Sequence, residues 1–132
     1  MRYQITKMQV LIVDSSVQIA RRLEEMLSEV NSITAVYTSV SYEDAILLFI
    51  ENRPDVVLLC TGLPENKSIE LLREMKTAVY RTTVVVLSVN TDEYLHEQCR
   101  LLGADCLLDK YLDFEKIPDV IDDISDINNI IH

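Results

Sequence analysis

Short apolar and β-branched runs recur along the chain and alternate with longer stretches of helical spacing. The strand-like runs lie at 9–13, 33–38, 56–59, 83–88 and 106–109. The run at 56–59 is continuous rather than alternating, which is typical of a strand covered on both faces. Apolar residues such as Ala20, Leu23 and Leu27 recur at three- and four-residue spacing, which predicts amphipathic helices between the strands. The pattern predicts five strand–helix units.

Five such units in order favour a parallel sheet with helices on both faces. The predicted fold is α/β, a flavodoxin-like (βα)5 three-layer sandwich whose parallel five-stranded sheet has the order 2-1-3-4-5. A length of 132 residues with 48% hydrophobic content fits one domain over residues 1–132, with its core at about residues 9–131.

Capping residues set the expected helix ends. Ser41 is a predicted N-cap, and Gly103 is expected at the C′ position, just after the end of the fourth helix. The first helix is expected to end around Asn31. The third is expected to begin at Ser68 and to carry Val79 on its inner face.

Charge and cysteine content exclude several classes of function. A net charge of -10 and a pI near 4.5 argue against direct binding to nucleic acid or to an anionic membrane. The longest apolar runs, such as 45–50, are too short to span a bilayer. Three cysteines without a CxxC pair argue against a disulfide framework and against structural zinc. We therefore expect a soluble cytoplasmic protein.

The candidate site lies where the predicted strands end. In the 2-1-3-4-5 order, strands one and three are neighbours at the reversal point, beyond which ligands bind in open α/β sheets. The ends of strands one, three, four and five present Asp14, Cys60, Ser88 and Lys110. These four residues form the one convergent polar set that the pattern predicts.

Four segments carry a resemblance to a known family. They are VLIVD at 10–14, PDVVLLCTGLP at 54–64, VVVLS at 84–88 and GADCLLDK at 103–110. In this order, at the ends of these strands, they resemble the response-regulator receiver domain over nearly the whole chain. The resemblance implies a role in two-component or phosphorelay signal transduction.

The resemblance also implies a role for each site residue. In that family, an acidic pair and an aspartate after strand three hold magnesium, and that aspartate accepts a phosphoryl group. Asp14 matches one acid of the pair, Ser88 the hydroxyl residue and Lys110 the lysine that contact the phosphoryl oxygens. Ser15 stands at the second acid and Cys60 at the phospho-acceptor. The chain is thus similar to a degenerate form, a pseudo-receiver.

Two further departures fall near the lysine. Leu107 stands at the switch position, where the family has an aromatic residue, and Tyr111 replaces the usual proline. Magnesium requires several oxygen ligands, so Asp14 alone is a residual metal ligand at most, and a thiol does not suit this ion. We therefore expect no cofactor, no metal and no phosphotransfer, so that the chain is not an enzyme.

Each candidate residue also has a structural interpretation. Cys60 is either a small buried apolar side chain or a thiolate activated by Lys110. Asp14 is expected to form an ion pair with Lys110, with residual cation binding as the alternative. Ser88 is expected to bond locally rather than to bind phosphate. Cys99 and Cys106 are expected in the core, and His96 and His132 in solvent.

The function predicted from the sequence is that of a stand-alone receiver without an aspartyl-phosphate switch. It would act by protein–protein contact, with a signalling protein or a second copy as its partner. The resemblance puts the interaction surface at Tyr94, Leu101 and Tyr111 and the edge of the last helix. The acidic row at 119–126 is either a solvated face or a docking surface for a basic partner. The alternatives are a thiol-based redox sensor using Cys60 and a weakly active receiver with Asp14 as acceptor.

Overall fold

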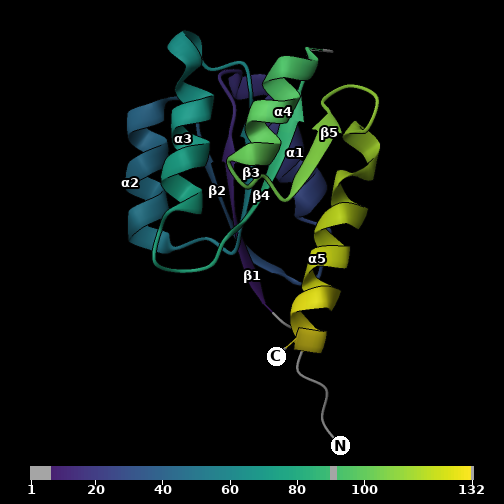
Figure 1. The fold of residues 1–132 in the computed structure, drawn as a ribbon. Coiled ribbons are helices and arrows are strands. Elements are labelled where there is room, and N and C mark those ends of the chain that lie inside the picture. The colour runs from purple at the N-terminus through teal and green to yellow at the C-terminus, as the bar shows by residue number, and fades with distance from the viewer. Residues whose placement is uncertain (1–6, 90–91, 132) are drawn as a thin grey trace, which may run out of the picture.

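The computed structural model describes residues 7–89 and 92–131, and the side chains of helix α5 only as far as residue 126. Five strands alternate with five helices (Figure 1). The strands are β1 (Met8–Val13), β2 (Ile33–Ser39), β3 (Val56–Cys60), β4 (Thr83–Ser88) and β5 (Cys106–Asp109). The helices are α1 (Val17–Leu27), α2 (Tyr42–Asn52), α3 (Lys67–Lys76), α4 (Glu93–Leu101) and α5 (Ile117–Ile131). Short 3-10 turns, Pro64–Asn66 and Phe114–Lys116, precede α3 and α5.

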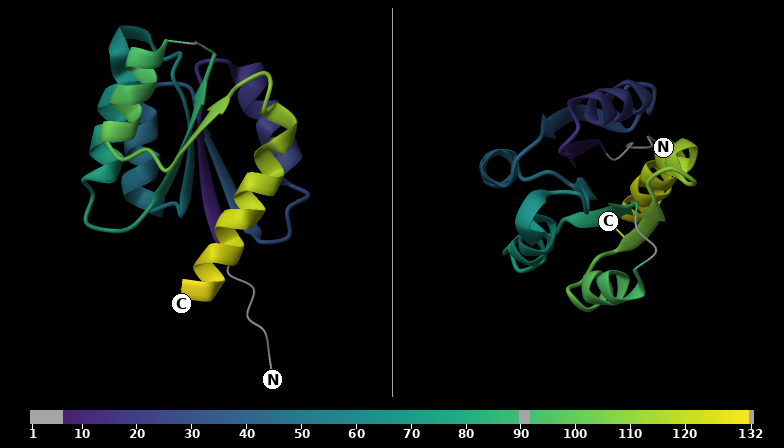
Figure 2. Two further views of the ribbon diagram at one scale, coloured as in Figure 1. Left: turned by 45° about the vertical axis from the view of Figure 1, so that its right-hand side comes forward. Right: turned by 90° about the horizontal axis from the view of Figure 1, so that it is seen from above.

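The sheet has the order β2-β1-β3-β4-β5, and all neighbours are parallel. This confirms the predicted topology. All five residues of the central strand β3 are buried, because helices cover both of its faces. Figure 2 shows α1 and α5 on one side of the sheet and α2, α3 and α4 on the other.

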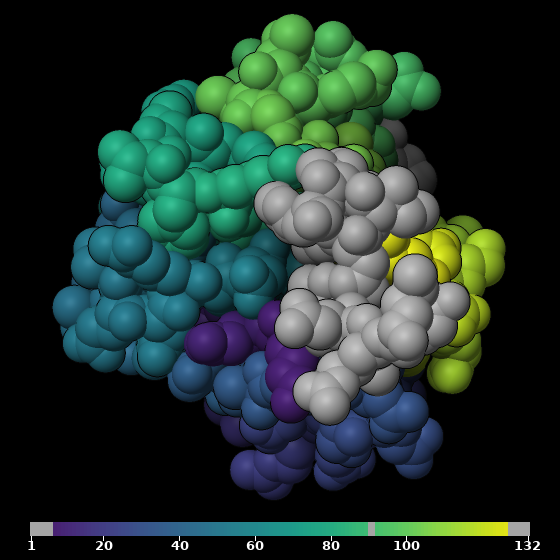
Figure 3. All heavy atoms as spheres, turned by 90° about the horizontal axis from the view of Figure 1, so that it is seen from below, coloured from purple at the N-terminus to yellow at the C-terminus, as the bar shows by residue number. Residues whose placement is uncertain are grey.

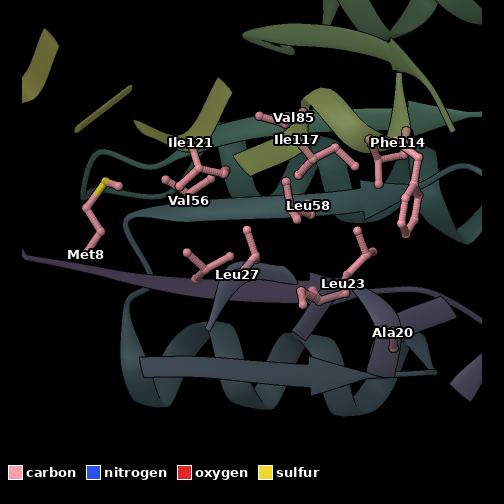
Figure 4. Packing of buried hydrophobic residues seen from close by; sticks show 13 residues of the cluster. Met8, Ala20, Leu23, Leu27, Val56, Leu58, Val85, Phe114, Ile117 and Ile121 are labelled. Atoms are coloured by element: carbon pink, nitrogen blue, oxygen red, sulfur yellow. The ribbon is translucent and has the colours of Figure 1, made fainter. Parts of the chain in front are cut away.

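Alternation along β3 divides the core in two. Val56 and Leu58 pack under α1 and α5, beside Leu23, Leu27 and Ile117 (Figure 4). The residues between them on β3 face the opposite way, toward α2, α3 and α4. The two clusters together hold the strand ends, and hence the candidate site, in a fixed arrangement.

Side-chain caps start three of the helices. Ser16, Ser41 and Asp92 accept the backbone N–H groups of Ile19, Asp44 and Tyr94. The predicted cap at Ser41 is thus confirmed. Gly103 follows α4 with φ +100°, a left-handed conformation that favours glycine, which confirms the predicted end of this helix.

Three predicted features of the helices were wrong. The first helix ends at Leu27 rather than near Asn31, because the chain turns there into β2. The third begins at Lys67 and ends at Lys76, so Val79 lies beyond it and is fully exposed, with a relative exposure of 102%. Ser68, predicted as the first residue of this helix, is a buried residue of its first turn, one position after its observed start.

Candidate functional site

The ends of four strands bring the predicted polar set together. Asp14 follows β1, Cys60 ends β3, Ser88 ends β4 and Lys110 follows β5. All four are buried although three are polar or charged. A buried polar group needs a partner, so the contacts among these residues decide what the site does.

Asp14 and Lys110 form a buried ion pair. Asp14 Oδ2 lies 2.7 Å from Lys110 Nζ, and the two side chains are 0% and 8% exposed. The backbone N–H of Ser16 donates to Asp14 Oδ1 at 2.8 Å. Beyond the ion pair, Oδ2 has no hydrogen bond among the described residues. The Asp14–Lys110 ion pair expected from the sequence is therefore present.

Cys60 is the second partner of the lysine. Lys110 Nζ donates to Cys60 Sγ at 3.0 Å, and the Gly62 N–H donates to the same sulfur at 3.5 Å. The cysteine is 1% exposed. A Cβ atom placed on Gly62 would lie 3.6 Å from Cys60 Sγ and 3.9 Å from Ser15 Oγ. Cys60 and Ser15 thus converge on one glycine at the edge of the site.

The contacts of Lys110 favour its positively charged form. Burial acts to lower the pKa of this lysine, because it disfavours the ammonium form. The hydrogen bonds to Asp14 and Cys60, and the attraction of both groups, outweigh burial and raise the pKa above its ordinary value of 10.5. Lys110 is therefore an ammonium at neutral pH, held between an oxygen and a sulfur.

Ser88 and His96 make a contact that the sequence did not predict. His96 Nε2 lies 3.2 Å from Ser88 Oγ, and the histidine is half-buried rather than solvated as expected. His96 stands three residues before the buried Cys99 on α4, and this i, i+3 relation is the signal that places it near β4. Ser88 was expected to bond locally, whereas the contact shown here joins it to a side chain eight residues away on α4. The other histidine, His132, lies outside the described residues.

The segment after β3 stabilises the backbone of Cys60. Ser68 Oγ donates to the Cys60 carbonyl at 2.6 Å and accepts the Leu63 N–H at 3.4 Å. Glu65 and Asn66 both have φ +59°, so the chain makes a tight left-handed turn before α3. Ser68 thus supports the backbone of the site residue Cys60. The sequence analysis had placed Ser68 only at the start of the third helix.

Comparison with known proteins identifies the architecture. The family model of the response regulator receiver domain matches residues 10–122 of the sequence. The chain belongs to the response regulator receiver family. Two solved structures share the receiver fold: the Francisella response regulator 1452 receiver domain and the response regulator domain of Thermotoga maritima CheB. The first has a TM-score of 0.81 and 20% identity and covers 92% of this chain and 99% of its own. The second has a TM-score of 0.78 and 19% identity and covers 96% of this chain and 98% of its own.

Relatives by sequence are longer proteins. A protein-glutamate methylesterase/protein-glutamine glutaminase of Nocardioides sp. is 30% identical over 95 residues, which are 72% of this receiver and 26% of that protein. A second enzyme of this name from Koribacter versatilis is 30% identical over 97 residues, 74% of this chain and 26% of its own. The receiver thus spans about a quarter of the length of these relatives.

The donor atoms of this receiver do not fit magnesium. Its site offers one carboxylate, Asp14, which is already paired with Lys110, and the soft sulfur of Cys60. Within residues 7–89 and 92–131, no group of three or more His, Cys, Asp or Glu side chains has the arrangement of a metal site.

The remaining predicted residues lie around the site. Leu107 on β5 is partly buried and packs into the cluster under α2, α3 and α4. Tyr94, Leu101 and Tyr111 are exposed, as an interaction surface requires. Cys99 is buried and Cys106 is partly buried, and both thiols are free. In the part of the chain that the structure describes, no helix has the length and apolarity to span a membrane.

Proposed function

We propose that this receiver has no phosphoryl switch and acts in signal transduction through protein–protein contacts that do not depend on phosphorylation. One observation carries the proposal: the Lys110 ammonium is shared by Asp14 at 2.7 Å and Cys60 at 3.0 Å. With this arrangement, the positive charge that would stabilise a transferring phosphoryl group is already neutralised.

The proposed partner surface is the exposed face around Tyr94, Leu101 and Tyr111. Two tyrosines and a leucine offer large apolar area, and aromatic residues are enriched in protein interfaces. The partner is a protein of a signalling pathway, and the acidic chain does not bind nucleic acid or membrane directly. Three free cysteines favour the cytoplasm as its compartment.

Phosphodonor treatment tests the proposal. The receiver is incubated with acetyl phosphate and Mg²⁺, and its intact mass is measured. We expect no phosphoryl adduct on the wild-type chain, because Cys60 offers no carboxylate and Asp14 is engaged with Lys110. A stable adduct overturns the proposal, and mapping it to Asp14 would establish the weakly active receiver instead.

A second function, a thiol-based redox sensor, is favoured by the Lys110–Cys60 contact. A neighbouring ammonium stabilises a thiolate, and the thiolate is the form that reacts with peroxide. The burial of Cys60 opposes this function, since peroxide must reach the sulfur.

Peroxide treatment separates the two functions. Under the first, Cys60 stays unmodified in the folded protein, as does the buried Cys99, which serves as an internal comparison. Selective oxidation of Cys60 to the sulfenic acid, detected by dimedone labelling and peptide mapping, would establish the sensor. Loss of that labelling in the Lys110→Met variant would then assign the activation to the lysine.

A further inference from the structure

Helix α2 carries more apolar surface than this chain buries. Residues 45–50 are apolar without interruption, so they point to every side of the helix. Ala45 and Phe49 pack in the core, whereas Leu47 and Ile50 are 57% and 63% exposed. A helix that is apolar all round is normally covered on all sides. The outer face of α2 therefore lacks a cover in the isolated chain.

The exposed apolar residues border a hollow. A depression of about 300 Å³ lies between the C-terminal part of α2 and the segment that follows α3, with Ile50 and Val79 on its rim. Figure 3, a view from below, shows these two parts of the chain side by side on one face. The Phe49 and Tyr80 rings line the hollow with their centroids 5.1 Å apart. The Tyr80 hydroxyl donates to the Phe49 carbonyl at 2.8 Å, so the rings are fixed in position.

Carboxylates surround the exposed apolar residues of α2. Glu43 and Glu51 lie four residues to either side of Leu47, so the three side chains share one face of the helix. Asp44 lies three residues before Leu47 on the same face. All three acidic residues are exposed, and none forms an ion pair with a residue that the structure describes. Since α2 contains no lysine or arginine, this face is apolar at its centre and negative around it.

The charge of Glu51 has no local compensation. Glu51 stands in the last turn of α2, where the helix dipole is already negative. Arg53, the C-cap of the helix, does not pair with it and lies over the Tyr80 ring at 5.6 Å from its centroid. A cation of another molecule beside Glu51 would therefore be attracted both by the carboxylate and by the end of the helix.

These charges decide which partner fits the outer face of α2. A second copy would bring the same carboxylates together, and like charges across an interface oppose association. An apolar partner without charge would desolvate the carboxylates and offer them no counter-charge. A partner with basic residues around an apolar centre complements both features. An amphipathic helix presents this arrangement, and such helices dock with their apolar side in apolar grooves.

We propose that the outer face of α2, defined as Glu43, Asp44, Leu47, Ile50 and Glu51, binds a basic amphipathic helix of another protein. Aliphatic side chains of that helix cover Leu47 and Ile50 and reach the hollow beside them. Glu43 and Glu51 are about 12 Å apart along α2, at about 1.5 Å per residue. Lysine or arginine residues seven or eight positions apart on the partner helix can therefore pair with both.

The outer face of α2 is separate from the surface proposed around Tyr94 and Leu101 on α4. Helix α3 contacts both α2 and α4 and lies between them (Figure 1). This arrangement lets one copy of the receiver bind two proteins. The contact on α2 does not depend on the chemistry of the Asp14–Lys110 pair.

A model peptide tests the outer face of α2. The probe is a helical peptide of about 18 residues made of leucine and lysine, with leucine at three- and four-residue spacing along one side. Calorimetry is expected to detect its binding to the wild-type chain. A scrambled peptide of the same composition and a leucine–glutamate peptide of the same pattern are expected not to bind. Backbone amide shifts in NMR spectra are expected to place the contact on α2.

Two pairs of variants assign the contact to this face. Leu47→Ser is expected to raise the dissociation constant about tenfold, because it removes an apolar contact. Val17→Ser is the matched control, since Val17 on α1 is 56% exposed on the other side of the sheet, and it should change nothing (Figure 2). Glu51→Lys is expected to raise the dissociation constant at least about fivefold at low salt, because like charges then meet. Glu25→Lys makes the same charge change near the end of α1 and should have an effect below about twofold.

The charge variants are expected to fold, because a lysine suits the last turns of a helix. Thermal melts verify this for every variant.

Four outcomes would overturn the proposal. They are no binding of the leucine–lysine peptide, equal binding of either comparison peptide, binding that Leu47→Ser and Glu51→Lys leave unchanged, and binding that the control variants weaken as strongly. A wild-type chain that self-associates in sedimentation velocity, and that Leu47→Ser makes monomeric, would assign the face to a second copy instead. No phosphodonor enters these measurements, so this proposal and the proposed function fail separately.

Discussion

Asp14→Asn is expected to lower the free energy of unfolding by about 3–5 kcal/mol, because it leaves the buried Lys110 ammonium without its carboxylate. The two side chains are 0% and 8% exposed, so water cannot replace the lost partner. Asparagine keeps an oxygen for the Ser16 N–H, which bonds Asp14 Oδ1 in the wild type. The substitution therefore removes the ion pair and turns the amide nitrogen, a donor, toward the Lys110 ammonium, and urea denaturation measures the combined effect.

Two controls show whether charge is the cause. Adding Lys110→Met to Asp14→Asn removes the unpaired charge, and we expect this double variant to recover to within about 1.5 kcal/mol of the wild type. Glu97→Gln breaks an exposed ion pair with Arg100 and is expected to change stability by less than about 1 kcal/mol. An Asp14→Asn variant as stable as the wild type would show that the pair does not stabilise the fold.

The pH dependence of this effect follows from the raised pKa of Lys110. A lysine whose pKa is higher in the folded protein adds stability below its ordinary pKa of 10.5, where it is charged in both states. That contribution is lost as the pH rises through the folded pKa. The stability difference between the wild type and Asp14→Asn is therefore expected to be constant near neutral pH and to shrink above pH 10.5.

The sequence predicted the sheet because its strands are marked independently of one another. Each of the five β runs is short, apolar and bounded by turn or cap residues, and the βαβ connection then leaves few topologies. The Asp14–Lys110 pair followed from the topology, since the end of β1 and the end of β5 lie at the same edge of the sheet. Where a contact joins the ends of two strands in a parallel sheet, the positions of the residues in the sequence are sufficient to predict it.

The features that were not predicted depend on where a helix ends and on where a side chain points. Val79 was assigned to the third helix by its spacing, but the helix ends at Lys76 and leaves this residue fully exposed. His96 was expected in solvent because its neighbours are polar, whereas its ring reaches Ser88 across the top of the sheet. Periodicity cannot give the length of a helix or the direction of a side chain at its edge.

Restoring carboxylates to the site is the strongest test of what this receiver lacks. The double substitution Ser15→Asp and Cys60→Asp adds two carboxylates beside Asp14, since both side chains converge on Gly62. Three carboxylates around one ammonium repel one another, so the variant is expected to be less stable than the wild type without metal. They also form the oxygen-rich set that magnesium prefers.

Magnesium should therefore stabilise the double variant and leave the wild type unchanged. At about ten times its dissociation constant, the ion adds about 1.4 kcal/mol to the folded state, which raises Tm by several degrees. The isosteric variant Ser15→Asn and Cys60→Asn provides the same shapes without the charges and should show no shift. If the carboxylate variant melts at the same temperature with and without Mg²⁺, then Ser15 and Cys60 are not what keeps metal from this site. Acetyl phosphate with Mg²⁺ should then form an adduct on the carboxylate variant alone, because only that variant combines an acceptor oxygen with a metal site.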